Sequence, residues 1–276
     1  MKTYSIGGQL LDFSTPKIMG ILNLTPDSFY DGGNYNDITE AIAKVVQMIN
    51  EGADIIDVGA VSTRPGAAKI STDEEISRIL PVVKEIKLQF PDIILSIDTT
   101  NSAVVKKISE FTAFILNDIS AFEFDAELPR IISQLQFPYI IMHMQGTPIN
   151  MQETPEYEDV SFEVLQFLSQ KAHKLRMAGV DQIIVDPGFG FGKTIQHNFE
   201  MLNKLNVFNI LEYPILAGLS RKSMIYKALD IEPQQALNGT TALNMLALKN
   251  GASILRVHDV KEAVETRTLW HHLNSI

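Results

Sequence analysis

The stretch Ala178-Gly179-Val180-Asp181-Gln182-Ile183-Ile184-Val185-Asp186 contains the pattern that decides the fold. A helix ends at a glycine, a short Ile/Val run follows, and the run ends in a carboxylate. Glycine suits the left-handed cap of a helix, and such a run is typical of a buried parallel strand. The same order recurs in Glu51-Gly52-Ala53-Asp54-Ile55-Ile56 and Asn250-Gly251-Ala252-Ser253-Ile254-Leu255. The chain is therefore predicted to repeat a helix-to-strand unit.

Short apolar runs that end in polar residues are spread over the whole chain. They cover residues 18–23, 55–59, 93–98, 114–118, 139–143, 183–186, 215–220 and 254–258. Helical periodicity or a helix-start signature marks segments between them, at residues 38–50, from 72 onward, 160–177, 234–249 and 260–273. Eight β–α units in 276 residues predict an α/β fold, a closed (β/α)8 TIM barrel. A doubly wound open sheet is the alternative.

The N-terminal segment has a different pattern from the repeated units. Residues 3–13 alternate around Gly7-Gly8, which predicts a small β-hairpin that covers the N-terminal face of the barrel. No linker rich in Pro, Gly or Ser interrupts the chain. Residues 1–276 are therefore predicted to form one domain.

The composition excludes several classes of function. The chain has 33 acidic and 23 basic residues and a net charge of −10, which argues against wholesale binding to nucleic acid or an anionic membrane. It has no cysteine, which excludes disulfides, thiol nucleophiles and cysteine-bound metals. No signal peptide is evident, and no apolar run approaches the roughly 20 residues of a membrane span. We expect a cytoplasmic protein.

Polar residues end every predicted strand, at the face where barrels of this kind carry their active sites. They are Asn23, Asp57, Asp98, Asn117, Asp118, His143, Asp186, Ser220, Arg221, Lys222, Arg256 and His258. Asp98, Asn117 and Asp186 suit a ligand with paired N–H donors, such as the edge of an amidine-like heterocycle. Each could instead cap a helix or pair with a neighbouring cation.

Cationic side chains form a second group at the same face. Arg64, Lys222, Arg256 and His258 come from different loops, and their convergence predicts a phosphate or diphosphate site. Surface ion pairs are the alternative. Two polar loops rich in Gly and Pro, residues 23–33 and 62–67, have the composition of binding loops over a barrel mouth.

The segment Gly188-Phe189-Gly190-Phe191-Gly192-Lys193-Thr194 is similar to a phosphate-binding P-loop, but Pro187 stands where that motif needs its first glycine. Such a loop instead lets a flat ligand approach the backbone. The six histidines form no metal-ligand motif, so a zinc or iron site is not expected. A magnesium ion held mainly by substrate phosphates, with one oxygen from Asn23, is consistent with the sequence.

These segments, taken in order, resemble one known family. The matching motifs are Met19-Gly20-Ile21-Leu22-Asn23-Leu24-Thr25-Pro26-Asp27-Ser28-Phe29, Asp57-Val58-Gly59 with Ser62-Thr63-Arg64-Pro65-Gly66, Ser96-Ile97-Asp98-Thr99, Asn117-Asp118-Ile119, Met142-His143-Met144-Gln145-Gly146, Asp186-Pro187-Gly188-Phe189-Gly190-Phe191-Gly192-Lys193, Ser220-Arg221-Lys222-Ser223 and Arg256-Val257-His258-Asp259. They resemble the dihydropteroate synthases, pterin-binding enzymes of folate biosynthesis, in their stand-alone bacterial form. The resemblance runs from about residue 17 to about residue 266.

The resemblance implies a transferase that condenses (7,8-dihydropterin-6-yl)methyl diphosphate with 4-aminobenzoate, giving 7,8-dihydropteroate and diphosphate. It also implies a magnesium ion at Asn23, a homodimer formed through the later helices, and a target for sulfonamides. The catalytic residues it implies are Asp98, Asp186, Lys222 and Arg256. The pterin-binding residues are Asp98, Asn117, Met142, Asp186, Phe191, Gly218 and Lys222. Diphosphate would meet Asn23, Thr63, Arg256 and His258, and 4-aminobenzoate would meet Phe29, Arg64, Pro65, Ser220 and Lys222.

One position departs from the family pattern. Val61 stands where the family has a glutamate, just before the second loop. This leaves open a slow enzyme or a non-catalytic pterin-binding paralogue. A pterin-binding methyltransferase barrel is another alternative, but it does not explain the first-loop motif or the pair Arg256 and His258.

Overall fold

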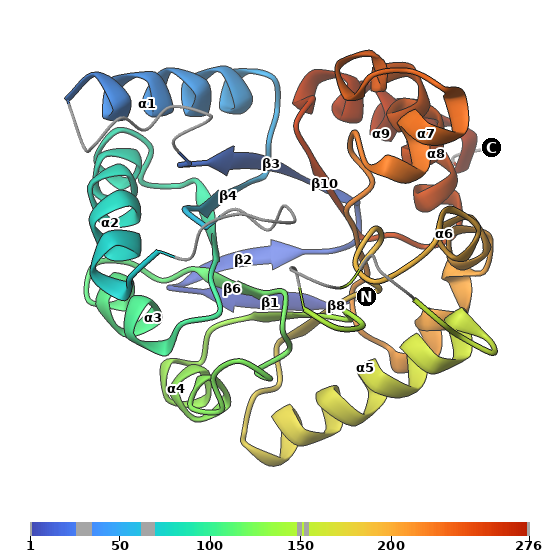
Figure 1. Cartoon of the computed structure of the whole chain (residues 1–276). Coiled ribbons are helices and arrows are strands. Elements are labelled where there is room, and N and C mark those ends of the chain that lie inside the picture. The colour runs from blue at the N-terminus through green and yellow to red at the C-terminus, as the bar shows by residue number, and fades with distance from the viewer. Residues whose placement is uncertain (1, 26–34, 62–69, 148–150, 152–154, 275–276) are drawn as a thin grey trace.

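The computed structural model describes residues 2–25, 35–61, 70–147, 151 and 155–274. Within these residues a sheet of eight parallel strands forms the centre of the molecule, and helices surround it (Figure 1). The strands are β3 (Lys17–Asn23), β4 (Ile55–Gly59), β5 (Ile94–Asp98), β6 (Ile115–Asp118), β7 (Tyr139–Met142), β8 (Ile183–Asp186), β9 (Leu216–Ala217) and β10 (Ile254–Val257).

The sheet closes on itself. Its strand order is β8-β7-β6-β5-β4-β3-β10-β9, and a parallel bridge between Val185 and Ile215 joins the two outer strands. The backbone N–H of Val185 also donates to the carbonyl of Pro214 at 3.0 Å. The predicted (β/α)8 barrel is therefore confirmed, and the open-sheet alternative is wrong.

Helices follow the strands around the outside of the barrel. They are α1 (Tyr35–Asn50), α2 (Thr72–Gln89), α3 (Ser102–Ser109), α4 (Leu128–Leu135), α5 (Val160–Met177), α6 (Ile195–Asn203), α7 (Ser223–Leu229), α8 (Leu237–Lys249) and α9 (Val260–Asn274), with the 3-10 helices η1 (Leu205–Leu211) and η2 (Pro233–Gln235). Gly52, Gly179 and Gly251 have φ angles of 98°, 87° and 99°, so the predicted glycine caps are confirmed. None of the helices in the described part of the chain is long and apolar enough to cross a membrane.

Two predicted elements are wrong in extent. The strand expected at residues 215–220 is only Leu216–Ala217, because the chain turns where the N–H of Lys222 donates to the carbonyl of Leu219 at 3.1 Å. The helix expected at residues 234–249 is divided into η2 and α8. Pro233 begins η2, and Glu232 and Gln235 cap it reciprocally, so the chain completes one separate turn before α8.

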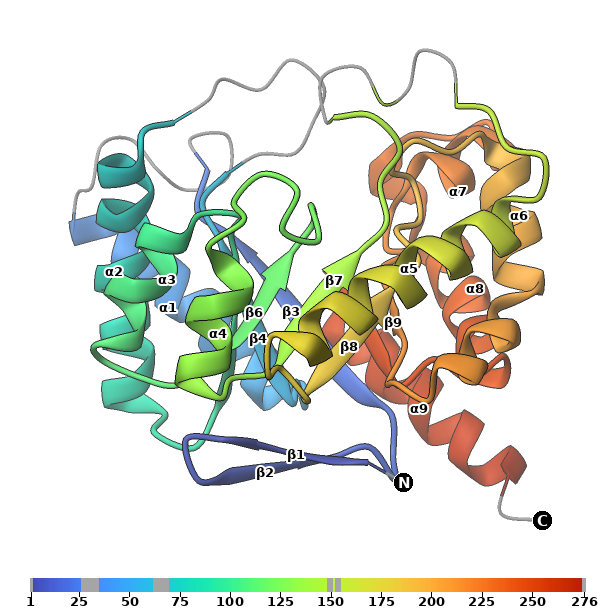
Figure 2. The ribbon, with the colours of Figure 1, turned by 90° about the horizontal axis from the view of Figure 1, so that it is seen from below.

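The N-terminal hairpin covers the lower end of the barrel, as predicted. Strands β1 (Thr3–Ile6) and β2 (Gln9–Asp12) pair in antiparallel fashion and lie across the N-terminal ends of the barrel strands (Figure 2). Tyr4, Ile6 and Leu11 pack against apolar side chains inside this end of the barrel, which are Met19, Ile55, Ile115, Ile140, Ile184, Leu216 and Ile254. The lower interior is thus apolar and closed, which leaves the opposite end for polar side chains.

Tyr4→Phe should lower the free energy of unfolding without changing catalysis. The buried Tyr4 hydroxyl donates to the carbonyl of Ile183 at 2.6 Å, and an unmatched buried carbonyl costs about 1–2 kcal/mol. Chemical denaturation measures this loss. Steady-state kinetics should match wild type, because the hairpin lies at the end of the barrel away from the polar mouth. A changed KM for either substrate would contradict this separation.

Candidate active site

Asp57 is a fully buried charged residue beneath the barrel mouth. It lies in the middle of β4 and is 0% exposed. The Asn117 amide donates to both of its carboxylate oxygens, at 3.1 and 3.3 Å, and Arg256 Nε donates to it at 2.6 Å. A buried carboxylate is tolerated when it is paired in this way. Asp57 therefore fixes two residues that the sequence predicts in the site.

Arg256 spans two carboxylates. Besides its bond to Asp57, its NH2 donates to Asp98 Oδ2 at 2.8 Å. Burial alone would lower the pKa of Arg256, but Asp57 and Asp98 raise it. Burial raises the pKa of Asp98 to about 7, although Arg256 opposes this shift. Asp98, Asn117 and Arg256 are thus brought together, as the sequence predicts.

The register of the sheet places further residues at this level. Asn23 is paired with Gly59, Gly59 with Asp98, and Asp98 with Asn117. A Cβ at Gly59 would lie 3.1 Å from the Cβ of Asp98, so a side chain here would press against Asp98. Asn23 therefore ends its strand in line with the residues of the predicted pterin site.

Lys222 forms the centre of the other half of the mouth. Its Nζ donates to the carbonyl of Phe189 and lies 4.8 Å from the centroid of the Phe191 ring. A Cβ at Gly218 would lie 3.6 Å from Lys222 Nζ and 4.0 Å from the Cβ of Arg256. Phe191, Gly218 and Lys222 are therefore neighbours, and Gly218 connects them to the half that contains Arg256.

Asp186 and Lys222 act on each other electrostatically. Burial raises the pKa of Asp186, and the cation of Lys222 opposes that rise. Burial lowers the pKa of Lys222 to about 8, and the carboxylate of Asp186 opposes that fall. The backbone N–H of Gly188 donates to Asp186 Oδ1 at 2.7 Å. Met142 is paired with Asp186 in the sheet and is buried.

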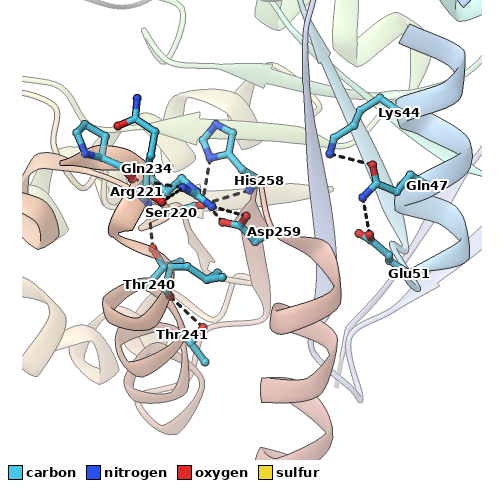
Figure 3. A network of polar contacts seen from close by, with 12 residues as sticks. Lys44, Gln47, Glu51, Ser220, Arg221, Gln234, Thr240, Thr241, His258 and Asp259 are labelled. Atoms are coloured by element: carbon cyan, nitrogen blue, oxygen red, sulfur yellow. Dashed lines mark hydrogen bonds and ion pairs between the residues drawn. The ribbon is translucent and has the colours of Figure 1, made fainter. Parts of the chain in front are cut away.

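His258 and Ser220 form a pair at the edge of the mouth (Figure 3). The hydroxyl of Ser220 lies 3.0 Å from His258 Nδ1 and accepts from the backbone N–H of His258 at 3.2 Å. Burial and the neighbouring Arg256 lower the pKa of His258 to about 4. Although the side chain of His258 is exposed at the mouth, the lowered pKa favours its neutral form, which offers an N–H donor to a ligand, whereas the sequence analysis groups it with the cations.

Arg221 lies beside the mouth, and its guanidinium group is bonded to other residues of the barrel rather than directed to a ligand. Its Nε and NH2 donate to the two oxygens of Asp259 at 2.9 and 2.8 Å, and its NH1 donates to the carbonyl of Gln234 at 2.7 Å. Figure 3 shows its side chain directed toward Asp259. Arg221 thus connects the turn after β9 with the start of α9.

Known proteins of similar sequence and fold show the family to which this arrangement belongs. The profile of the family described as "Pterin binding enzyme" matches residues 19–258. The dihydropteroate synthase of Escherichia coli K12 is 44% identical over 260 residues, covering 94% of this chain and 92% of its own. That of Haemophilus influenzae is 43% identical over 272 residues, covering 98% of each chain.

The chain belongs to the dihydropteroate synthase family of pterin-binding enzymes.

Solved structures of this family have the same architecture. The dihydropteroate synthase of Yersinia pestis, solved as a sulfonamide drug complex, has a TM-score of 0.93 and 39% identity over 100% of both chains. The enzyme of Xanthomonas albilineans, solved with 7,8-dihydropteroate, has a TM-score of 0.89 and 34% identity over 100% of both chains. These matches favour a synthase over the methyltransferase alternative.

Some residues that the sequence assigns to the site lie outside the described residues. They are Phe29, Thr63, Arg64 and Pro65, together with most of the loops 23–33 and 62–67. Their assignments stay predictions. Asp118 is described, and it is structural: both of its oxygens accept bonds within the turn that follows β6 and from the hydroxyl of Tyr139.

The role of Asp57 is missed by the sequence analysis, which names it only as a strand end. A carboxylate within an otherwise apolar strand is the available signal. What cannot be read from the sequence is its partners, because Arg256 lies 199 residues away along the chain. The ion pair forms only when β4 and β10 are both part of the closed barrel.

The pH profile of kcat/KM should fall as pH rises through about 8. The reason is that burial lowers the pKa of Lys222 to about 8, so the cation is present below this pH and is lost above it. Lys222→Arg keeps its charge at all these pH values and should move the alkaline limb beyond the measured range. A wild-type profile that stays flat between pH 7 and 10 would contradict this assignment.

Proposed function

We propose that this protein joins the methylene carbon of dihydropterin methyl diphosphate to the amine of 4-aminobenzoate. The carbon–oxygen bond to diphosphate breaks, a carbon–nitrogen bond forms, and the amine loses a proton. The products are 7,8-dihydropteroate and diphosphate. The observation that carries this proposal is the double ion pairing of Arg256 with Asp57 and Asp98 at the open end of the barrel, beside the charges of Asp186 and Lys222 that act on each other, in a chain of this family.

The pterin ring is recognised by acceptors. Asp98 and Asp186 accept from its N–H groups, which is a strong and directional match. Asp57 can only accept hydrogen bonds, so the Asn117 NH2 group faces it. The amide oxygen of Asn117 is thereby turned toward the ligand. The flat ring is lined by apolar residues that fit closely around it, which are Met142, Phe191 and Gly218.

The charges of the mouth favour departure of diphosphate. Arg256 and the N–H of His258 bind the departing oxygens, where negative charge develops. Cleavage leaves positive charge on the methylene carbon and the pterin, and Asp98 and Asp186 stabilise it across a short distance in a water-poor site. No protein nucleophile is needed, in agreement with a chain without cysteine.

A magnesium ion carried by the substrate fits the donors present. Among the described residues no group of three or more His, Asp or Glu could hold a metal ion, so a site made by protein alone does not fit. Asn23 supplies one amide oxygen at the mouth, and magnesium commonly takes few protein ligands and several phosphate oxygens. Bound there, the ion would neutralise charge on the diphosphate.

The 4-aminobenzoate site is proposed from family analogy and lies beside Lys222. Phe29, Arg64, Pro65 and Ser220 complete it, with Arg64 matching the benzoate carboxylate. A protein of this kind is also a target for sulfonamides.

A diphosphate-release assay tests the function directly. Purified protein, magnesium, dihydropterin methyl diphosphate and 4-aminobenzoate should release diphosphate, and the product should be 7,8-dihydropteroate by mass. Release that does not depend on 4-aminobenzoate would indicate hydrolysis. Pterin binding without any release would favour the non-catalytic paralogue that Val61 leaves open.

A homodimer formed through the later helices is part of the proposal. Large apolar side chains are exposed on α6 to α9, among them Phe199, Leu229, Leu246, Leu269 and Leu273. Burial of such side chains between two copies would stabilise a dimer. A single domain over residues 1–276 and a cytoplasmic location stay predictions.

Asp98→Asn and Asp186→Asn should each weaken pterin binding and leave the fold intact. Each change places an N–H donor opposite the donors of the ring, and such a mismatch costs about 1–3 kcal/mol, or roughly 5- to 150-fold in Kd. Calorimetry with a pterin analogue measures the loss. Asp54→Asn is a matched control, since Asp54 also pairs with an arginine, Arg267, but at the start of β4. Wild-type affinity in both site variants would place the pterin elsewhere.

Val61→Glu should lower the KM for 4-aminobenzoate and leave pterin binding nearly unchanged. Val61 is 41% exposed, and it follows Ala60, whose carbonyl accepts from Arg78 at 3.3 Å. A glutamate adds an acceptor that braces the next segment, worth at most about 1.5–3 kcal/mol. Steady-state kinetics with each substrate varied, and Val61→Leu as control, measures the effect. Turnover that appears only in Val61→Glu would support the paralogue, and identical parameters would make Val61 a neutral packing residue.

A further inference from the structure

The glycine-rich segment 188–192 is not explained by the site as described so far. Gly188, Gly190 and Gly192 have φ angles of 72°, 81° and 60°. A Cβ at Gly188 would lie 1.9 Å from the carbonyl oxygen of His143, and one at Gly192 would lie 2.4 Å from that of Gln145. The segment is thus pressed against the chain that follows β7, with no room for side chains at these two positions.

Lys193 follows this segment and places its amine inside it. The residue is 2% exposed, and its Nζ lies 2.8 Å from the carbonyl of Gly188, 3.0 Å from that of Phe191 and 2.9 Å from His143 Nδ1. An ammonium group has three donors, and each has an acceptor. Burial lowers the pKa of Lys193 well below its usual range, and the nearby carboxylate of Asp186 opposes that shift. The three acceptors likewise favour the charged form of the amine.

His143 is the neutral partner that this arrangement requires. Burial and the cation of Lys193 lower its pKa to about 2, and its ring packs edge-on against Phe167 at a centroid distance of 4.9 Å. When Lys193 is an ammonium, His143 Nδ1 accepts from Lys193 Nζ at 2.9 Å and the imidazole proton lies on Nε2. The sequence analysis places His143 among the polar strand ends of the active-site face. The structure shows instead that its ring contacts the amine of Lys193 and so helps to hold segment 188–192.

The same segment supplies the surfaces that hold Lys222. The carbonyl of Phe189 accepts from Lys222 Nζ, the ring of Phe191 lies 4.8 Å from it, and a Cβ at Gly190 would lie 3.1 Å from Lys222 Cδ. Asn198 of α6 anchors the outer side, accepting from the N–H of Gly190 at 2.7 Å. Any movement of the segment would thus change the position of Lys222.

We propose that Lys193 is a positioning residue of the reaction, whose side-chain amine holds segment 188–192 in the one conformation that fixes Lys222 and Phe191 against the pterin. This inference rests on the proposed function. It also explains why the segment is no phosphate site, since all three donors of the amine are bonded within the protein.

Lys193→Met tests the proposal, because methionine is of similar length and removes the three donors. Lys171→Met is the matched control: Lys171 is 5% exposed, donates to the carbonyl of Ala121 at 2.9 Å and pairs with Glu123. Both variants lose a buried ammonium group. Only Lys193 is connected to Lys222.

We expect Lys193→Met to reduce kcat/KM for dihydropterin methyl diphosphate by roughly tenfold to a hundredfold, since a small misplacement of a positioning group has effects of this size. In the pH profile of kcat/KM of this variant, the alkaline limb should move to a pH above about 8. The reason is that water entering around Lys222 removes the burial that lowers the pKa of Lys222. Lys171→Met should keep the wild-type kcat/KM and the wild-type limb, whatever its loss of thermal stability.

Two results would overturn the proposal. One is Lys193→Met with wild-type kcat/KM and a wild-type alkaline limb. The other is a loss of activity that parallels the loss of thermal stability in both variants, with no shift of the limb. If Lys193→Met does not fold, Lys193→Gln, which keeps two N–H donors, is measured in the same way, with a smaller change expected. Wild-type protein without turnover would instead reject the proposed function, and calorimetry with a pterin analogue would then test the loop by itself.

Discussion

A carboxylate buried in an apolar barrel must have its charge matched, and Asp57 imposes this requirement on the whole mouth. Its two partners, Asn117 and Arg256, come from β6 and β10, on either side of β4 in the sheet order. The same guanidinium then meets Asp98. One buried charge thus sets the orientation of three side chains, and the upper layer of the site is built on them.

Charges of both signs lie side by side in this mouth, and burial acts on them in opposite directions. It raises the pKa of Asp98 to about 7 and lowers that of Lys222 to about 8. An acid and a base whose pKa values converge near neutrality can each change state with a small change in surroundings. A ligand that carries N–H donors at one end and a diphosphate at the other matches both signs at once.

The sequence predicts those features of the fold and site that depend on short segments. Repeated Ile/Val runs, the glycine caps and the hairpin around Gly7-Gly8 are local patterns, and the structure confirms them. The helices α3, α4, α6 and α7 have only seven to nine residues, too few for a clear period. The partners of Asp57 and the acceptors of Lys193 depend on segments far apart in the chain, and no local pattern indicates them.

The hairpin beneath the barrel has a consequence for the order of folding. Its residues leave the ribosome before every strand of the barrel, yet Tyr4 bonds to Ile183 and the hairpin packs in the same cluster as Ile254. The floor of the barrel can therefore close only when almost the whole chain has been synthesised. Contacts of such long sequence separation slow folding, and until then the apolar faces of Ile6 and Leu11 have no barrel to cover. The nascent chain must remain in solution with this surface unburied, so the hairpin, which is synthesised before the barrel strands, is protected only after them.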